Sequence, residues 1–200
     1  MPVVQMGNGY YFLYLIVGVL ATIGIIKLLK KKSRGYRHWF LFGVLMASFF
    51  VHFIKVIFYP YTTLDYPFRR ATFENICAVN TVLFPLVYLT KSKVLKDYMI
   101  MSGIFSGLVA FIIPVNAFSE YFDGILLGYQ SAFSIEIIRF YFNHLILFLV
   151  PFVLMYYKMH TISYKRAYKT ILVFFGVLVL IFINELIITA LGWVPRAMLF

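Results

Sequence analysis

The sequence predicts an all-α fold: a polytopic membrane helical bundle of about six transmembrane helices, in a single domain of residues 1–200. Of its 200 residues, 63% are hydrophobic and only 12% are charged, whereas soluble domains carry about 25% charged residues. The apolar residues are also collected into runs close to the roughly 20 residues that a helix needs to cross a bilayer. The expected spans are 10–29, 39–59, 72–89, 97–118, 133–157 and 170–193.

The basic residues predict how these spans are oriented. The net charge is +11, but most lysines and arginines lie in three short loops, 27–37, 91–96 and 158–169. They do not form one basic soluble face, so no nucleic acid is expected as a partner. Cytoplasmic loops carry the excess of Lys and Arg, so we expect a multi-pass protein of the cell membrane with both termini extracytoplasmic. His38, directly after the first of these basic loops, and His160, in the third, are expected to be solvated.

The first apolar run is interpreted as a transmembrane helix rather than a cleavable signal. No basic residue precedes it, and it is too long for the apolar core of a signal peptide. The chain has a single cysteine, Cys77, which excludes an internal disulfide and a multi-cysteine metal site. We therefore expect neither a metal nor a cofactor.

Polar side chains inside the apolar runs gather toward one side of the bilayer. With a helical rise of about 1.5 Å per residue, the expected topology places them in the outer half or near the middle. Polar groups are costly in hydrocarbon and are candidates for function, so this asymmetry predicts a polar cavity that opens outward or into the outer leaflet. The candidates are His52, Lys55, Glu74, Cys77, Asn80, Asn116, Glu136, Arg139, Asn143, His144, Asn184 and Glu185.

Several of these candidates also have a purely structural interpretation. Glu136 and Arg139, three residues apart on one helical face, are either a charge-cancelling pair or part of a substrate site. Lys55 either extends to the membrane interface or binds substrate. Asn184 and Glu185 either join helices by hydrogen bonds or contact substrate.

Cys77 and His144 are expected at similar depth on different helices. A lone buried cysteine is most often a small hydrophobic residue, and a lone histidine is often a structural donor. Together with amide and cationic neighbours, the two residues make nucleophilic catalysis a hypothesis.

Short motifs resemble a known family. The segments 74–80 (ENICAVN) and 84–86 (FPL) resemble the cysteine-bearing helix of integral membrane acyltransferases related to transmembrane protein 164, whose bacterial members include YwaF-type proteins. Further motifs similar to those of the family lie in the expected order along the chain: 52–55 (HFIK), 96–98 (KDY), 142–144 (FNH) and 183–185 (INE). The resemblance covers about residues 38–192.

This chain departs from the family pattern in two places. YwaF-type proteins often have a histidine two residues before the cysteine, where this chain has Asn75. Relatives also continue beyond the region 184–192, so we expect either a missing final helix or a shorter member of the family.

The resemblance implies acyl transfer between phospholipids by a cysteine and a histidine, which are Cys77 and His144 here. The expected partner is a phospholipid in the bilayer, because an outward-facing site would not meet cytosolic acyl-CoA. Neighbouring side chains are expected to stabilise the oxyanion or hold the phosphate: Asn80, Asn143, Lys55 and Arg139. Two alternatives stay open: a small-solute transporter or substrate-binding membrane subunit, and a structural lipid-binding protein without catalysis.

Overall fold

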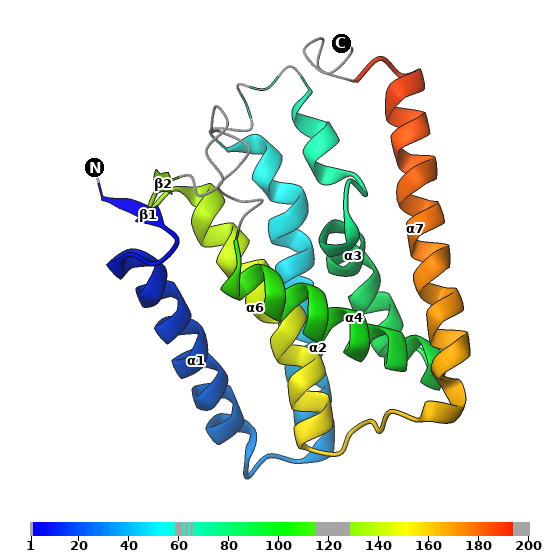
Figure 1. Ribbon diagram of the computed structural model, residues 1–200. Coiled ribbons are helices and arrows are strands. Elements are labelled where there is room, and N and C mark those ends of the chain that lie inside the picture. The colour runs from blue at the N-terminus through cyan, green and yellow to red at the C-terminus, as the bar shows by residue number, and fades with distance from the viewer. Residues whose placement is uncertain (1, 59–61, 63, 65, 115–128, 194–200) are drawn as a thin grey trace.

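The computed structural model describes residues 2–58, 62, 64, 66–114 and 129–193, and these form a nearly all-helical bundle (Figure 1). The predicted all-α fold is confirmed, with one small addition. Strands β1 (Val3–Gln5) and β2 (Tyr129–Ser131) pair antiparallel at one end of the bundle. The α-helices in the described part are α1 (Gly9–Leu29), α2 (Arg34–Ile54), α3 (Ile76–Leu89), α4 (Lys93–Ile112), α6 (Ile135–Tyr156) and α7 (Ala167–Ala190).

Most of these helices begin at a side chain that caps the first turn. A capping oxygen accepts a hydrogen bond from a backbone N–H that has no partner within the helix. This explains why the helices start at polar residues that interrupt the apolar runs. The capping residues are Asn8, Ser33, Asn75, Ser92 and Ser134.

The third predicted span differs from the others. Five helical segments in the described part are long and apolar enough to cross a membrane, but α3 is not among them. Its 14 residues extend about 21 Å, less than the roughly 30 Å of a bilayer core. The prediction of a helix from residue 72 was wrong because Asn75 caps α3, and the preceding η3 (Pro67–Ala71) is a separate 3-10 turn.

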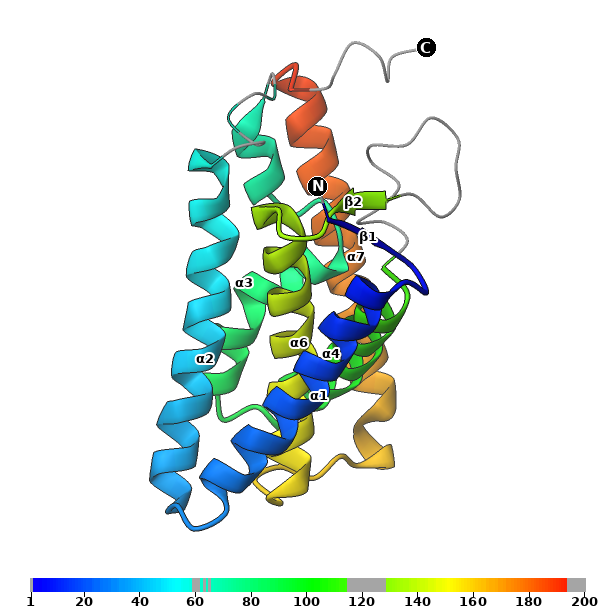
Figure 2. The same cartoon turned by 90° about the vertical axis from the view of Figure 1, so that its left-hand side faces the viewer.

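Helix α6 lies at the centre of the bundle, between α1 on one side and α7 on the other (Figures 1 and 2). Its buried residues include His144 and Asn143. By contrast, α1 and α7 expose most of their apolar side chains. Helices that are hydrophobic all round and still exposed are suited to a lipid environment.

Two glycines allow α4 to lie directly against α6. A Cβ atom on Gly103 would lie 2.6 Å from the Leu147 carbonyl oxygen, and one on Gly107 would lie 2.6 Å from the Phe148 nitrogen. Small residues four apart let helix backbones approach closely in membranes. Pro151 lacks the N–H that would bond the Leu147 carbonyl, and its ring also lies against Gly103. The backbone of His144 is therefore held close to α4.

At the other end of the bundle, the basic loops 91–96 and 158–169 meet at a buried carboxylate. Asp97 is only 1% exposed; its Oδ1 lies 2.6 Å from His160 Nε2, and Arg166 Nε donates to its Oδ2 at 2.6 Å. His160 is thus bound to the protein rather than solvated. His38 also packs, with its ring centroid 4.8 Å from that of Tyr88. The expectation of a solvated His160 was wrong, because its partner Asp97 is 63 residues away in the sequence. His38 is half-buried.

We expect Asp97→Asn to destabilise the fold strongly. Breaking a buried ion pair by removing one partner leaves uncompensated polar groups and costs about 3 kcal/mol. Thermal unfolding of the purified protein in one detergent measures the effect. The matched control is Glu185→Gln, because Glu185 pairs with Arg69 at 3.6 Å but is 39% exposed, and exposed pairs contribute about 1 kcal/mol or less. Equal shifts in the two variants would contradict a structural role for Asp97.

Candidate functional site

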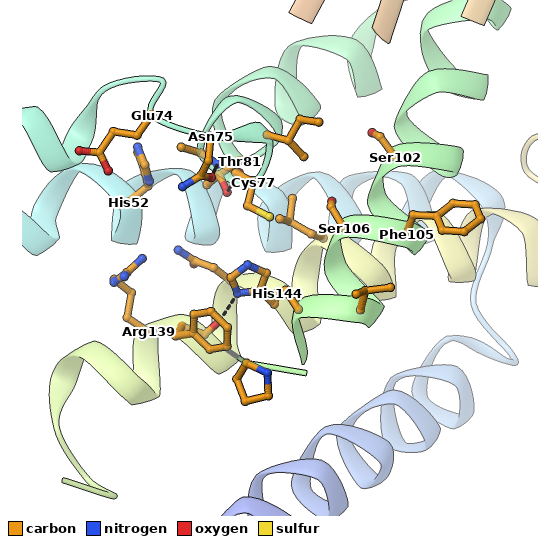
Figure 3. A pocket seen from close by; sticks show the side chains of 18 of the residues that line it. His52, Glu74, Asn75, Cys77, Thr81, Ser102, Phe105, Ser106, Arg139 and His144 are labelled. Carbon is orange, nitrogen blue, oxygen red and sulfur yellow. Dashed lines mark hydrogen bonds between the residues drawn. The ribbon is translucent and has the colours of Figure 1, made fainter. Parts of the chain in front are cut away.

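A cavity of about 770 Å³ lies toward the end of the bundle that carries η1 (Lys55–Ile57) and η3 (Figure 3). Side chains of α2, α3, α4, α6 and α7 contribute to its wall. Among the residues expected from the sequence, those that line it are His52, Lys55, Glu74, Cys77, Glu136, Arg139, Asn143 and His144. The cavity therefore joins residues from five separate parts of the chain.

His144 has a defined tautomer in this wall. Its Nδ1 lies 2.8 Å from the carbonyl oxygen of Phe140, one turn earlier on α6 (Figure 3). A carbonyl oxygen only accepts hydrogen bonds, so Nδ1 carries the hydrogen. In the neutral ring Nε2 then keeps its lone pair. The Phe140 ring packs at 4.2 Å from the imidazole and helps to fix its orientation.

Cys77 lies in the first turn of α3 and is half-buried. Figure 3 shows its side chain and the His144 ring on the wall of the same space, with Ser106 of α4 beside the sulfur. The Ser106 hydroxyl is close enough to act electrostatically on the Cys77 thiol and to favour its thiolate form. In this conformation Cys77 and His144 are not hydrogen-bonded to each other. Such contacts often form only when substrate is bound.

Asn80 lies behind the cavity wall rather than in it. It is fully buried, and its oxygen accepts a hydrogen bond of 2.7 Å from Tyr98. Its amide nitrogen donates to Ser102 at 3.3 Å and to Ser106 at 3.4 Å. Because the Ser106 oxygen accepts from Asn80, its own hydrogen is available to the sulfur of Cys77. The geometry gives Asn80 the role of positioning Ser106.

Asn143 lies next to His144 and lines the cavity. Its Oδ1 accepts a 3.0 Å hydrogen bond from Ser48 of α2. The carbonyl end of the amide is therefore held by α2, and the NH₂ group is the donor that Asn143 offers to the cavity.

Charged residues collect at one part of the cavity. Arg139 forms a salt bridge with Glu136, and Arg70 pairs with Glu74 at 3.5 Å. Lys55 lies within electrostatic range of all four. Glu136 and Arg139 thus neutralise each other as an ion pair, and both side chains also line the cavity. Three cations and two carboxylates make this region suitable for a zwitterionic group.

Like Asn80, Asn184 and Glu185 lie outside the cavity lining. Asn184 accepts from the backbone N–H of Phe73 at 3.3 Å and donates to Thr72, while Glu185 pairs with Arg69. These contacts attach α7 to the segment before α3, which agrees with the structural interpretation of Asn184. Asn116 lies outside the described residues.

Sequence reasoning missed Ser106 and Arg70. Ser106 lies four residues after Ser102, so both share one face of α4 with the glycines that contact α6. That spacing was a usable signal for a small polar face. Arg70 lies before the apolar run of α3, and nothing in its local sequence indicates that it reaches the cavity.

The apolar part of the cavity continues onto the outer surface of the bundle. Phe105 and Val109 of α4 line it while being 70% and 52% exposed, and Phe174 of α7 lines it at 37% exposure. In a bilayer such side chains contact lipid. The cavity is thus bordered by charged groups on one side and by lipid-facing groups on the other.

Long apolar helices around a polar cavity define a multi-pass membrane protein. The TMEM164 family model matches residues 5–191, and the chain belongs to the TMEM164 family. No curated protein and no solved structure gives a significant match to the chain.

Proposed function

We propose that this membrane protein is an acyltransferase that moves a fatty acyl group between glycerophospholipids through Cys77 and His144. The observation that carries the proposal is the tautomer of His144. With Nδ1–H bound to the Phe140 carbonyl, the basic Nε2 belongs to a ring that borders the same cavity as the only thiol of the chain. A nucleophile and a base on one cavity are the minimum for covalent acyl transfer.

The first half of the reaction forms an acyl-enzyme. Nε2 of His144 takes the thiol proton, and the thiolate of Cys77 attacks the ester carbonyl of the donor lipid. The C–O bond to the glycerol then breaks. The leaving alkoxide takes the proton from His144, which releases a lysophospholipid and leaves an acyl thioester on Cys77.

The second half reverses these roles with another lipid. A hydroxyl of the acceptor lysophospholipid loses its proton to His144 and attacks the thioester carbonyl. The C–S bond breaks, and the thiolate recovers the proton from His144. The Asn143 amide is the candidate donor to the oxyanion in both halves, and the Ser106 hydroxyl is the candidate donor to the thiolate.

The walls of the cavity support a lipid substrate. Phe105, Val109 and Phe174 offer an acyl chain a path from the bilayer. The charged region with Lys55 and Arg139 suits a zwitterionic lipid headgroup, which carries a phosphate and a cationic group. A transporter for small solutes does not need a cavity bordered by lipid-facing phenylalanines.

The proposed orientation places this cavity on the extracytoplasmic side. β1 and the last turn of α7 lie at the same end of the bundle, and the basic loops lie at the other (Figure 1). The excess of basic loop residues supports a cytoplasmic position for that second end. Cysteine-accessibility labelling of single-cysteine variants in both end regions of intact cells tests this orientation.

Capture of the acyl-enzyme tests the function most directly. Purified protein in nanodiscs of phosphatidylcholine with a radiolabelled acyl chain is expected to acquire label that hydroxylamine removes, as a thioester requires. Addition of lysophosphatidylcholine is expected to discharge the label into phosphatidylcholine. Cys77→Ser should carry no hydroxylamine-labile label, whereas Ser163→Ala, near the opposite end of the bundle, should label like the parent protein.

Either of two results would overturn the proposal. One is hydroxylamine-labile label that persists in Cys77→Ser. The other is a folded parent protein that neither acquires label nor transfers acyl chains, while solute flux across vesicles depends on the cavity charges. The second result would favour the transporter.

A further inference from the structure

A second cavity, of about 380 Å³, lies near the opposite end of the bundle from Cys77. Residues from the start of α2, the start of α4 and the end of α6 meet there. Arg34 connects two of these parts, because its Nη2 donates to the Met159 carbonyl at 3.4 Å. The lining residues are Arg34, Gly35, His38, Tyr88, Lys96, Leu154, Met159 and His160.

The wall of this cavity is positively charged. Arg34 and Lys96 both line it and repel each other electrostatically. The one carboxylate in the described residues close to this wall is Asp97, which is already bound by Arg166 and His160. The cavity also lies at the amino end of α2, of which Arg34 is the first residue, and helix amino ends favour anions.

The position of the cavity relates it to a membrane surface. α2 and α4 are both long enough to span a bilayer, and their amino ends form part of the wall. A group held there lies at the level of lipid headgroups. Basic pockets between transmembrane helices at this level bind anionic headgroups.

We propose that this cavity binds the phosphate group of an anionic ligand, through Arg34 and Lys96. The ligand is either the headgroup of an anionic phospholipid of the leaflet at this end or a soluble phosphate. The site is separate from the cavity of Cys77, and its occupation does not depend on acyl transfer.

A tryptophan reporter adjoins the site. Trp39 is exposed, and its ring lies 5.3 Å from that of His38, which lines the cavity. The chain has two tryptophans, so Trp193→Phe leaves Trp39 alone. This protein is placed in phosphatidylcholine nanodiscs that contain a minor fraction of either brominated phosphatidylglycerol or brominated phosphatidylcholine. We expect the brominated anionic lipid to quench Trp39 more strongly than the neutral lipid.

Three double variants distinguish binding at this cavity from nonspecific attraction of anionic lipid by surface charge. Arg34→Gln with Lys96→Gln should reduce the preference for the anionic lipid about tenfold. Lys30→Gln with Lys31→Gln removes the same charge from a loop outside the cavity lining and should reduce it much less. Arg34→Lys with Lys96→Arg keeps the charge and should retain the preference, and circular dichroism checks that every variant is folded.

Soluble phosphate identifies the source of the ligand. Loss of the extra quenching on addition of inorganic phosphate, at constant ionic strength, assigns the site to a soluble phosphate. Persistence of the quenching assigns it to the lipid headgroup. Equal quenching by the two brominated lipids, together with no response of Trp39 fluorescence to inorganic phosphate, would overturn the proposal. An equal loss in the loop variant and the cavity variant would also overturn it.

Discussion

Replacing His144 by glutamine is expected to reduce the rate of acyl transfer on the order of 10³-fold. Glutamine offers an amide N–H to the Phe140 carbonyl but has no basic nitrogen to take the proton of the Cys77 thiol. The loss should appear in kcat, because the proton transfer occurs after the lipid has bound. The measurement is transfer of a labelled acyl chain from phosphatidylcholine to lysophosphatidylcholine in nanodiscs.

Two controls accompany the His144 variant. The unfolding temperature of His144→Gln should stay close to that of the parent protein, because the glutamine amide can replace the hydrogen bond to the Phe140 carbonyl. Ser163→Ala should transfer at the parent rate. A folded His144→Gln protein with the parent rate would show that another group removes the thiol proton.

The second large effect is expected for Gly107→Ala. The added Cβ would lie 2.6 Å from the Phe148 nitrogen and 2.9 Å from the His144 carbonyl oxygen. Both are backbone atoms, so α4 must move away from α6, at a cost of about 2 kcal/mol. Ser106 moves with α4, and displacement of reacting groups by about 1 Å lowers rates about 10²-fold.

Gly43→Ala is the matched control for Gly107→Ala. Its Cβ would meet nothing within 4 Å, and alanine is the better helix former, so stability should be unchanged or slightly higher. Unfolding temperatures and transfer rates of the two variants are compared in one detergent and one nanodisc composition. If both behave alike, close packing of α4 on α6 does not position the site.

The helices were predictable because lipid requires long apolar segments that satisfy their own backbone hydrogen bonds. Each predicted span contains the greater part of one described helix. The start of α3 was not predictable from hydropathy, because Phe73 and Ile76 look alike on that scale. The helix begins where the Asn75 side chain accepts a hydrogen bond from the N–H of Ala78. Hydropathy averaged over a window of residues does not detect such a capping hydrogen bond.

The candidate site was predictable only in outline. The depth of polar residues indicated which side chains share one side of the bilayer, and Cys77, His144 and Asn143 do line one cavity. The depth of a residue in the membrane does not tell which way its helix is rotated, so it did not distinguish Asn143 from Asn80. The Asn80 amide faces away from the cavity and bonds Tyr98 and two serines. Asp97 and His160 are 63 residues apart, and only the packed helices bring them together.

The lipid-facing side of the large cavity has a kinetic consequence. An occupant that arrives between Phe105 and Phe174 diffuses in two dimensions and never dissolves in water. Its encounter frequency then follows its mole fraction in the membrane, not its bulk concentration. If the proposed lipid substrate enters this way, turnover at constant substrate is expected to fall when inert detergent or lipid is added to dilute the surface.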